Sequence, residues 1–181
     1  MQTETLVLAG GCFWCTEAVF DRVRGVLDVE SGYSNGQAER PTYAQVCTGA
    51  TGCAEVVKLV YDPAVIGVRE LLTIFFATHD PTTPNRQGAD IGTQYRSGIY
   101  WTTPQQAAVA RALIAELDAE GALGAPIVTE VEPLRHYWPA EDEHQDFFAR
   151  HPDHGYCLAV AAPKVAKLQR VFARYLKPAP G

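Results

Sequence analysis

The sequence predicts an α+β fold, a ferredoxin-like split βαβ two-layer sandwich with additional C-terminal helices and long loops. First, apolar residues alternate in several short segments and recur at helical spacing in the segments between them. Second, these segments follow the order strand, helix, strand, long loop, strand, helix, strand, which is that of the split arrangement. Third, 181 residues of 47% hydrophobic composition suffice for one core, so we expect a single domain over residues 1–181.

The first half of the chain supplies three strands and one helix. Residues 4–9 alternate in hydrophobicity and predict a strand, and the glycine turn that follows leads into a helix over 14–22. Residues 26–31 follow as a second strand, and the alternating residues 54–61 as a third. Between these two strands lies a polar, glycine-bearing loop over 32–53, and loops of this length tend to be functional.

The second half supplies another strand–helix unit and further helices. Residues 68–78 carry apolar side chains at helical spacing, and an apolar strand over 97–101 follows a polar loop over 79–96. The helix expected over 105–120 has a proline in its first turn and Gly121 at its end. We further expect a strand over 127–131, helices over 141–151 and 163–176, and a tail over 178–181.

The charge of the chain argues against two classes of partner. The formal net charge is -6 and no basic run exceeds two residues, so we expect neither nucleic acid nor a membrane surface as a partner. Residues 1–4 lack the basic and apolar regions of a signal peptide, and a cytoplasmic location is therefore expected. The five cysteines are an odd number, which fits reduced thiols better than a secreted disulfide framework.

The stretch Gly10-Gly11-Cys12-Phe13-Trp14-Cys15 lies at the junction of the first strand and the first helix. A thiol at such a turn faces the free amides and the positive dipole end of the helix, which favour a thiolate over a thiol. We therefore expect Cys12 to be a nucleophile. Cys15, three residues later, is close enough to form a disulfide with it.

Further candidates surround this nucleophile if the strands lie adjacent, as the split pattern predicts. We expect Glu55, at the start of an apolar strand, to be partly buried, to hold a proton near neutral pH and to act as a general acid. Phe13 and Trp14 are expected to wall an apolar pocket suited to a small methyl-bearing group. Loop residues that could supply hydrogen bonds are Tyr43, Asp90 and Tyr95.

Two other interpretations of the cysteines stay open. Cys12 and Cys15 have the C-x-x-C spacing, after a strand, of a general thiol-disulfide oxidoreductase of the thioredoxin type. They could also belong to a zinc-stabilised binding module, although five residues separate Cys47 from Cys53 rather than two to four. Helix histidines are far more often solvated than ligands, so neither a metal nor another cofactor is expected. The histidines in question are His136, His144, His151 and His154.

Longer motifs accompany these residues. They are Gly11-Cys12-Phe13-Trp14, Tyr43 to Gly49 leading to Ala54-Glu55-Val56-Val57, His79-Asp80-Pro81-Thr82, Asn85-Arg86-Gln87-Gly88, Asp90 to Ser97, and Pro139-Ala140-Glu141-Asp142. In this combination they resemble the peptide methionine sulfoxide reductase A family over roughly residues 5–165.

The resemblance implies a reaction that the local chemistry supports. The thiolate of Cys12 would attack the sulfur of methionine (S)-sulfoxide, free or in peptides and proteins, while Glu55 delivers a proton to the oxygen. Methionine would leave, Cys12 would become a sulfenic acid, and a second cysteine would condense with it to a disulfide. Such a disulfide needs an external dithiol such as thioredoxin, and the activity would repair oxidised proteins. The resemblance assigns the methyl pocket to Phe13 and Trp14 and the polar contacts to Tyr43, Asp90 and Tyr95.

The sequence departs from the family pattern at three positions. Cys53 stands where a histidine is common, and Glu143 stands where a tyrosine commonly follows Pro-Ala-Glu-Asp. Both departures bear on substrate binding. Cys15 stands where a glycine is common, which adds a candidate for the second redox cysteine.

Two cysteines compete for that second role. Cys15 lies within the first helical turn after Cys12, and a short loop closes more readily than a distant segment swings. Cys157 lies in a glycine-containing stretch between two predicted helices, and members of the family often use a cysteine in the C-terminal region. It could reach Cys12 only if that stretch lies over the active site. We favour Cys15 and keep Cys157 open.

Overall fold

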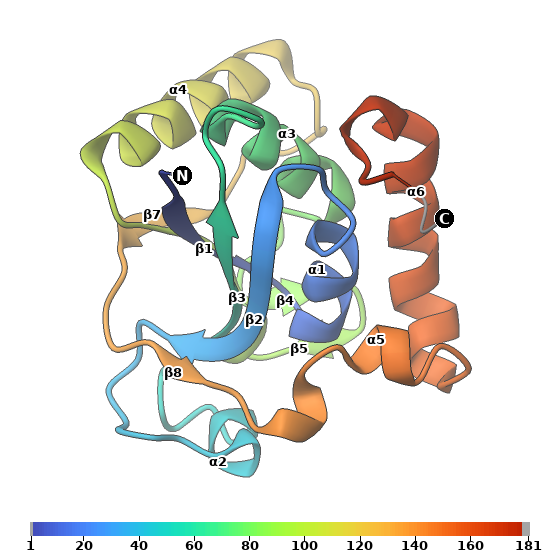
Figure 1. Cartoon of the computed structure of the whole chain (residues 1–181). Coiled ribbons are helices and arrows are strands. Elements are labelled where there is room, and N and C mark those ends of the chain that lie inside the picture. The colour runs from blue at the N-terminus through green and yellow to red at the C-terminus, as the bar shows by residue number, and fades with distance from the viewer. Residues whose placement is uncertain (1, 179–181) are drawn as a thin grey trace.

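A six-stranded mixed sheet forms the centre of the structure, a computed structural model that describes residues 2–178 (Figure 1). In spatial order the strands are β7 (Glu130–Pro133), β6 (Ser97–Trp101), β1 (Glu4–Gly10), β3 (Ala54–Tyr61), β2 (Val26–Ser34) and β8 (Trp138–Pro139). Neighbouring strands are antiparallel except β6 and β7, which are parallel. The combination of this sheet with helices confirms the predicted α+β class.

Helices cover one face of the sheet. The longer ones are α1 (Phe13–Phe20), α3 (Val68–Thr78), α4 (Pro104–Glu120) and α6 (Ala162–Val171), the last continuing from a π-helical turn, η3 (Cys157–Ala161). The helix α1 connects β1 to β2 and α3 connects β3 to β6, and each connection passes over the strand that lies between its two ends. The turn between β1 and α1 therefore lies at the end of an interior strand of the sheet.

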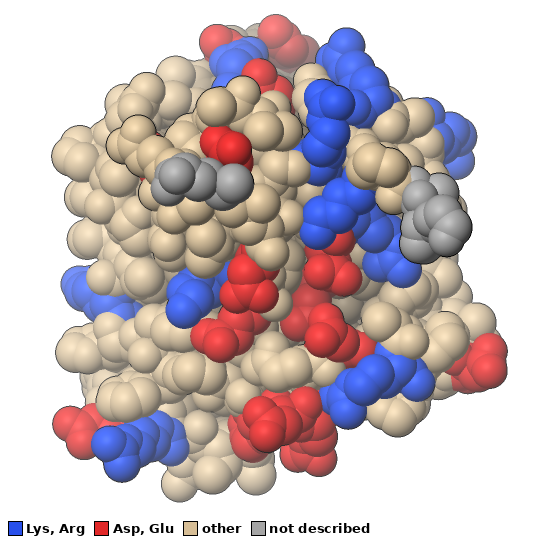
Figure 2. All heavy atoms as spheres, in the orientation of Figure 1, with Lys and Arg blue, Asp and Glu red and all other residues tan. Residues whose placement is uncertain are grey.

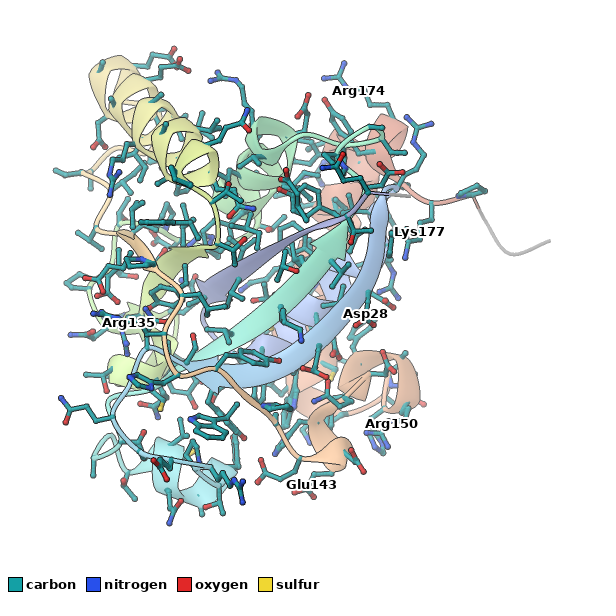
Figure 3. The ribbon with its side chains drawn as sticks, turned by 60° about the vertical axis from the view of Figure 1, so that its left-hand side comes forward. Asp28, Arg135, Glu143, Arg150, Arg174 and Lys177 are labelled. Atoms are coloured by element: carbon teal, nitrogen blue, oxygen red, sulfur yellow. The ribbon has the colours of Figure 1, made fainter. Side chains whose placement is uncertain are left out.

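The period-two pattern of the strands separates the two faces. On β1, Leu6 and Leu8 point into the main core, where they meet the apolar side chains of the four helices. Val7 and Ala9 point to the opposite face and belong to a smaller cluster, which Tyr137 helps to cover. Figure 3 shows the segment between β7 and β8, which carries Arg135, crossing that second face. Removing apolar surface from water contributes about 25 cal/mol per Å², and this burial stabilises the packing on both faces of the sheet.

The caps of α4 explain why this helix was predicted so closely. The hydroxyl of Thr103 accepts the backbone N–H of Gln106, and the Gln106 side chain accepts the backbone N–H of Thr103, a capping box. Gly121 ends the helix in the left-handed conformation, with φ of 63°. The strands at 4–9, 54–61 and 97–101 and the helices at 14–22, 68–78 and 105–120 all lie within two residues of their predicted bounds.

Tertiary pairing moves the bounds of two strands. β2 runs on to Ser34 instead of ending at 31, because Gly32 to Ser34 pair with the first residues of β3. The strand predicted at 127–131 begins only at Glu130, where parallel pairing with β6 starts. β-Propensity reflects such context more than the residue itself, which is why sequence patterns place strand ends poorly.

The two long loops contain short elements that the sequence did not predict. They are α2 (Tyr43–Cys47), the hairpin of β4 (Arg86–Gln87) and β5 (Asp90–Ile91), and the 3₁₀ turn η1 (Thr93–Tyr95). Each of them carries or adjoins a residue that was predicted to face the nucleophile. The loops are therefore ordered around the site.

The C-terminal third differs most from the prediction. The helix expected at 141–151 is broken into a 3₁₀ turn, η2 (Asp142–His144), and a short helix, α5 (Phe147–Arg150). The break occurs because Gln145 leaves the helical conformation and bonds through its side chain to the backbone of Ser31. The helix expected at 163–176 begins at Cys157, ends at Val171 and is followed by the 3₁₀ turn η4 (Ala173–Tyr175). The predicted tail lies mostly outside the described residues.

Among residues 2–178 we find no helix of the length and hydropathy that crossing a bilayer requires.

Candidate active site

Cys12 lies at the turn between β1 and α1, as the motif predicts. Gly11 adopts φ of +93°, a conformation that favours glycine, and a Cβ there would lie 2.6 Å from Cγ of Gln87. Cys12 is the N-cap residue of α1, and its carbonyl accepts the backbone N–H groups of Cys15 (3.1 Å) and Thr16 (3.4 Å). Local backbone geometry therefore places the thiol at the helix N-terminus.

Glu55 lies beside this turn and is only 1% exposed. Its Oε1 accepts the backbone N–H of Phe13 at 3.2 Å, while Oε2 is buried and has no partner among the described residues. Burial raises the pKa of Glu55 to about 8, against a smaller lowering by the Phe13 hydrogen bond. Glu55 is thus buried beside the turn, and a raised pKa of this kind favours the protonated carboxyl near neutral pH.

The thiols of Cys12 and Cys15 interact with each other. Burial raises the pKa of Cys12 well above its ordinary value, and its hydrogen bond to Cys15 and the charge of Glu55 act in the same direction. The same hydrogen bond lowers the pKa of Cys15 to about 7, and the charge of Lys164 contributes to the lowering. The raised pKa of Cys12 runs against the expectation that the helix N-terminus favours its thiolate, and Cys15 is the more acidic thiol of the pair.

Asp90 reaches this pair through a residue that the sequence did not single out, Tyr156. The Tyr156 hydroxyl donates a 2.6 Å hydrogen bond to Oδ2 of Asp90 and lies 3.7 Å from Sγ of Cys15. Tyr95 is half-buried nearby, and its pKa is raised by burial first and by the charges of Glu55 and Asp90 next. Asp90 and Tyr95 thus lie near Cys12, Cys15 and Glu55. The only sequence signal for Tyr156 was its position directly before Cys157.

Aromatic rings line the other side of the site. Trp14 stacks on Phe147 with 3.8 Å between ring centroids, and its Nε1 donates to Nδ1 of His144 at 3.2 Å. The His144 ring lies 4.5 Å from that of Tyr43 and 5.3 Å from that of Phe13. Phe13 itself is 1% exposed and lies beneath the other rings, while Trp14 and Tyr43 remain accessible. We call these five residues the aromatic group: Phe13, Trp14, Tyr43, His144 and Phe147.

Glu141 holds the aromatic group in place. Its Oε1 accepts the hydroxyl of Tyr33 at 2.8 Å, and its Oε2 accepts the backbone N–H of Tyr43 at 2.9 Å. One carboxylate thus ties α2 to β2. The sequence identified Glu141 only as part of a motif. Its hydrogen bonds could not be predicted, because its partners lie about a hundred residues earlier in the chain.

Cys157 lies against the same site. It is fully buried in a small cluster with Cys15 and Ala161, and Cys12 packs on that cluster. Burial raises the pKa of Cys157. The stretch that carries Cys157 therefore lies over the active site, which was the condition for its participation. Of the remaining cysteines, Cys47 is exposed at the end of α2 and Cys53 is buried beside Thr51.

One group with metal-ligand geometry occurs in the part of the chain that the structure describes. It comprises Glu141, Glu143 and His144, whose ligand atoms lie within 4.8 Å of one another, and it includes no cysteine. Nδ1 of His144 already accepts the Trp14 hydrogen bond, so a neutral ring carries its proton on Nε2 and has no lone pair left for a metal. The four-cysteine arrangement of a zinc-stabilised module does not form among the described residues.

Comparisons with known proteins agree with the geometry. A sequence model of the family described as peptide methionine sulfoxide reductase matches residues 4–176. The chain is 57% identical over 178 residues to the peptide methionine sulfoxide reductase MsrA of Ralstonia nicotianae, covering 96% of this chain and 93% of the relative. It is 51% identical to MsrA of Deinococcus radiodurans, covering 96% and 84%.

Solved structures are similar as well. Mxr1 from Saccharomyces cerevisiae in reduced form superposes with a TM-score of 0.79 at 36% identity, covering 86% of this chain and 90% of that one. Mxr1 in complex with Trx2 gives a TM-score of 0.56 at 28% identity, covering 81% and 85%. Sequence, fold and the arrangement around Cys12 agree, and the chain belongs to the peptide methionine sulfoxide reductase family.

Proposed function

We propose that this protein reduces methionine sulfoxide, free or in peptides and proteins, to methionine and thereby repairs oxidised proteins. The observation that carries the proposal is the meeting of three groups at the start of α1: the thiol of Cys12, the protonated carboxyl of Glu55 and the acidic thiol of Cys15. Membership of the family supports the substrate. The S epimer is assigned from the resemblance of the motifs to the A family.

In the first half of the reaction the thiol of Cys12 loses its proton, and Cys15, with its pKa of about 7, is placed to receive it. The sulfur of Cys12 attacks the sulfoxide sulfur, and the carboxyl of Glu55 protonates the sulfoxide oxygen through its free Oε2. The sulfoxide becomes a thioether and leaves as methionine, while the oxygen stays on Cys12 as a sulfenic acid. Thiol and sulfoxide are thus converted to sulfenic acid and thioether, which balances atoms and electrons.

The aromatic group supplies the binding site in this proposal. Trp14 and Tyr43 are accessible, and Phe13 supports them from below. Together they offer the methyl group of the substrate an apolar surface. Asp90 and Tyr95 line the same site and are assigned to polar contacts with the substrate.

In the second half a thiol condenses with the sulfenic acid and releases water. We assign this step to Cys15, because it already contacts Cys12 and is the thiol most readily ionised at neutral pH. Cys157 packs on Cys15 and is the alternative resolving thiol. Thioredoxin or a similar dithiol then reduces the disulfide, a partner that the relative Mxr1, solved in complex with Trx2, supports.

Finer assignments of fold and location belong to the same proposal. The order β6-β1-β3-β2, with α1 and α3 as the connecting helices, supports a ferredoxin-like split βαβ two-layer sandwich. A core that runs from β1 to α6 supports a single catalytic domain. Five free cysteines and the need for a dithiol reductant support a cytoplasmic location.

Steady-state turnover with dithiothreitol tests the proposal. The wild-type protein should reduce methionine (S)-sulfoxide and leave the R epimer unchanged. Cys47→Ser, which alters an exposed cysteine that is not in the cluster of Cys12, Cys15 and Cys157, should stay close to the wild type, and Cys12→Ser should be inactive. Reduction of protein disulfides without any reduction of methionine sulfoxide would instead identify a general thiol-disulfide oxidoreductase.

A further inference from the structure

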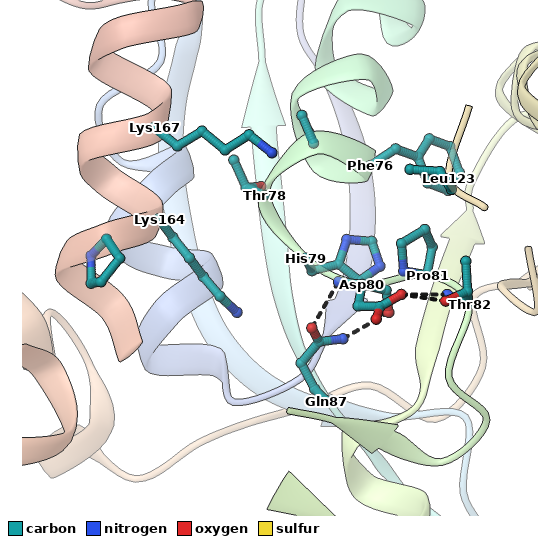
Figure 4. A pocket seen from close by; sticks show the side chains of 12 residues that line it. Phe76, Thr78, His79, Asp80, Pro81, Thr82, Gln87, Leu123, Lys164 and Lys167 are labelled. Carbon is teal, nitrogen blue, oxygen red and sulfur yellow. Dashed lines mark hydrogen bonds between the residues drawn. The ribbon is translucent and has the colours of Figure 1, made fainter. Parts of the chain in front are cut away.

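A surface cavity of about 660 Å³ lies between the end of α3, the segment at 79–87 and the start of α6 (Figure 4). Figure 4 shows Lys164 and Lys167 extending from α6 toward the cavity, with Phe76 and Leu123 at its opposite end. The cavity thus has a cationic end and an apolar end. In the catalytic steps described above neither end contacts the substrate, and Lys164 enters only through the effect of its charge on the pKa of Cys15.

The positive charges of the cavity are not neutralised. Neither Lys164 nor Lys167 forms an ion pair with any residue in the described range 2–178. Asp80 is the carboxylate that lines the cavity, and its Oδ1 is occupied by the backbone N–H (3.0 Å) and the hydroxyl (2.5 Å) of Thr82. Two unpaired ammonium groups beside an apolar surface fit an acidic side chain that adjoins an apolar one.

The two lysines belong to a wider basic band. Residues 154–181 carry five Lys and Arg and no Asp or Glu, whereas the rest of the chain carries ten Lys and Arg and 21 Asp and Glu. The band comprises Lys164, Lys167, Arg170, Arg174 and Lys177. On the side of the molecule that Figure 2 displays, Lys and Arg gather at the upper right and Asp and Glu gather below them. Such separation of charge in a chain of net charge -6 favours one orientation of an acidic partner.

The cavity borders the redox thiols. The helix α6 continues from η3, whose first residue, Cys157, packs on Cys15. On the other side Gln87 lines the cavity and packs over Gly11, next to the nucleophile. An occupant of the cavity therefore lies beside the cysteines that form the disulfide, and it leaves the aromatic group at Trp14 free for substrate.

We infer that this cavity, bounded by Lys164, Lys167, Phe76 and Leu123, is a docking site for the protein dithiol that reduces the enzyme, and that it takes an acidic side chain of that partner. This role rests on the proposed function, since a disulfide-cycling enzyme is what needs such a partner. A protein interface covers roughly 800 Å² on each side, enough to span from Cys15 to a cavity that adjoins it. Opposite charges across the interface speed the encounter and fix its orientation.

Charge reversal at one lysine tests this site. Lys167→Glu is the test variant, because it changes an exposed cavity residue away from the thiols, and Arg111→Glu on the exposed face of α4 is the control with the same change of net charge. Each is assayed for sulfoxide reduction with thioredoxin and, separately, with dithiothreitol, which is uncharged and needs no docking site. With thioredoxin, kcat/KM of Lys167→Glu should fall about tenfold and lose much of its dependence on ionic strength. Arg111→Glu should stay within about twofold of the wild type.

With dithiothreitol both variants should match the wild type. The docking site would be overturned if Lys167→Glu and Arg111→Glu had equal kcat/KM values with thioredoxin. It would also be overturned if Lys167→Glu lost as much activity with dithiothreitol as with thioredoxin. Inhibition of the dithiothreitol reaction by inorganic phosphate, relieved in Lys167→Glu, would make the cavity a small-anion site and also overturn it. Absence of any wild-type turnover with dithiothreitol would contradict the proposed function itself, which separates the two failures.

Discussion

Oε1 of Glu55 accepts a 3.2 Å hydrogen bond from the backbone N–H of Phe13, the residue that directly follows Cys12. This contact joins β3 to the first turn of α1 across 42 positions of sequence. It fixes one carboxyl oxygen and leaves Oε2 buried and unpaired. Burial also raises the pKa of this carboxyl to about 8. A carboxyl fixed in this way can give its proton to an acceptor that is bound next to Cys12.

Glu55→Gln should therefore slow the chemical step. The amide keeps the size of the carboxyl but has no proton to give, and a general acid is typically worth about a hundredfold or more. In the wild type the protonated fraction of Glu55 falls as pH rises through about 8, so the single-turnover rate should decline there. The variant should lose this decline. Rapid-quench measurements of methionine formation from pH 6 to 9.5 give both quantities, with Glu39→Gln as a surface control. A Glu55→Gln rate equal to that of the wild type at every pH would remove Glu55 from the mechanism.

The first disulfide should join Cys12 to Cys15. The two thiols interact directly, and the lowered pKa of Cys15 supplies a thiolate near pH 7. Reduced protein is treated with methionine sulfoxide in the absence of reductant, and peptide mass analysis then locates the disulfide in the wild type, Cys15→Ser and Cys157→Ser. We expect a Cys12–Cys15 bond in the wild type and in Cys157→Ser, and loss of thioredoxin-dependent turnover in Cys15→Ser.

A Cys12–Cys157 bond in the wild type, together with full thioredoxin-dependent turnover of Cys15→Ser, would transfer the resolving role to Cys157. Cys47→Ser serves as the control, because Cys47 is exposed and outside the cluster of the three redox cysteines.

Glu17 should make stability depend on pH. It is 3% exposed on α1, accepts the Ser31 hydroxyl at 3.0 Å, and burial raises its pKa to about 7 from 4.5. A group whose pKa is higher in the folded state stabilises the fold below its unfolded pKa, and this contribution is lost as pH rises through about 7. The loss between pH 5 and 8 is on the order of 3 kcal/mol, and Glu17→Gln should abolish it.

Urea unfolding of the wild type, Glu17→Gln and the exposed control Glu120→Gln at pH 5 and pH 8 measures this effect. The wild type should lose unfolding free energy between pH 5 and pH 8, whereas Glu17→Gln should not. Relative to the wild type, the variant should therefore be more stable at pH 8 than at pH 5. An equal difference at the two pH values would mean that Glu17 does not titrate differently on folding.

Local signals in the sequence were sufficient for the nucleophile and its acid. The glycine turn before Cys12 and the apolar strand that begins beside Glu55 are properties of a few consecutive residues, so both positions could be predicted. The ionisation of Cys12 could not, because burial by distant segments raises its pKa and no local motif reports burial. For the same reason the helix expected at 141–151 is broken, since Gln145 bonds to Ser31, 114 positions away.

The supporting residues of the site escaped prediction because they act through long-range contacts. Tyr156 reaches Asp90 across 66 positions, His144 reaches Trp14 across 130, and Glu141 reaches Tyr33 across 108. Taken singly in the sequence, a tyrosine, a histidine and a glutamate in polar stretches carry no signal of such partners. The family resemblance identified the motif that contains Glu141 but not what its carboxylate binds.

A single turnover without reductant tests the central claim, that Cys12 takes the oxygen of methionine sulfoxide. Fully reduced protein, freed of dithiol, is mixed with excess methionine (S)-sulfoxide, and methionine and free thiols are counted over time. The wild type should give a burst of one methionine per protein with the loss of two thiols, and Cys12→Ser should give neither. Methionine formation by Cys12→Ser at the wild-type rate, or no burst in the wild type, would contradict the account.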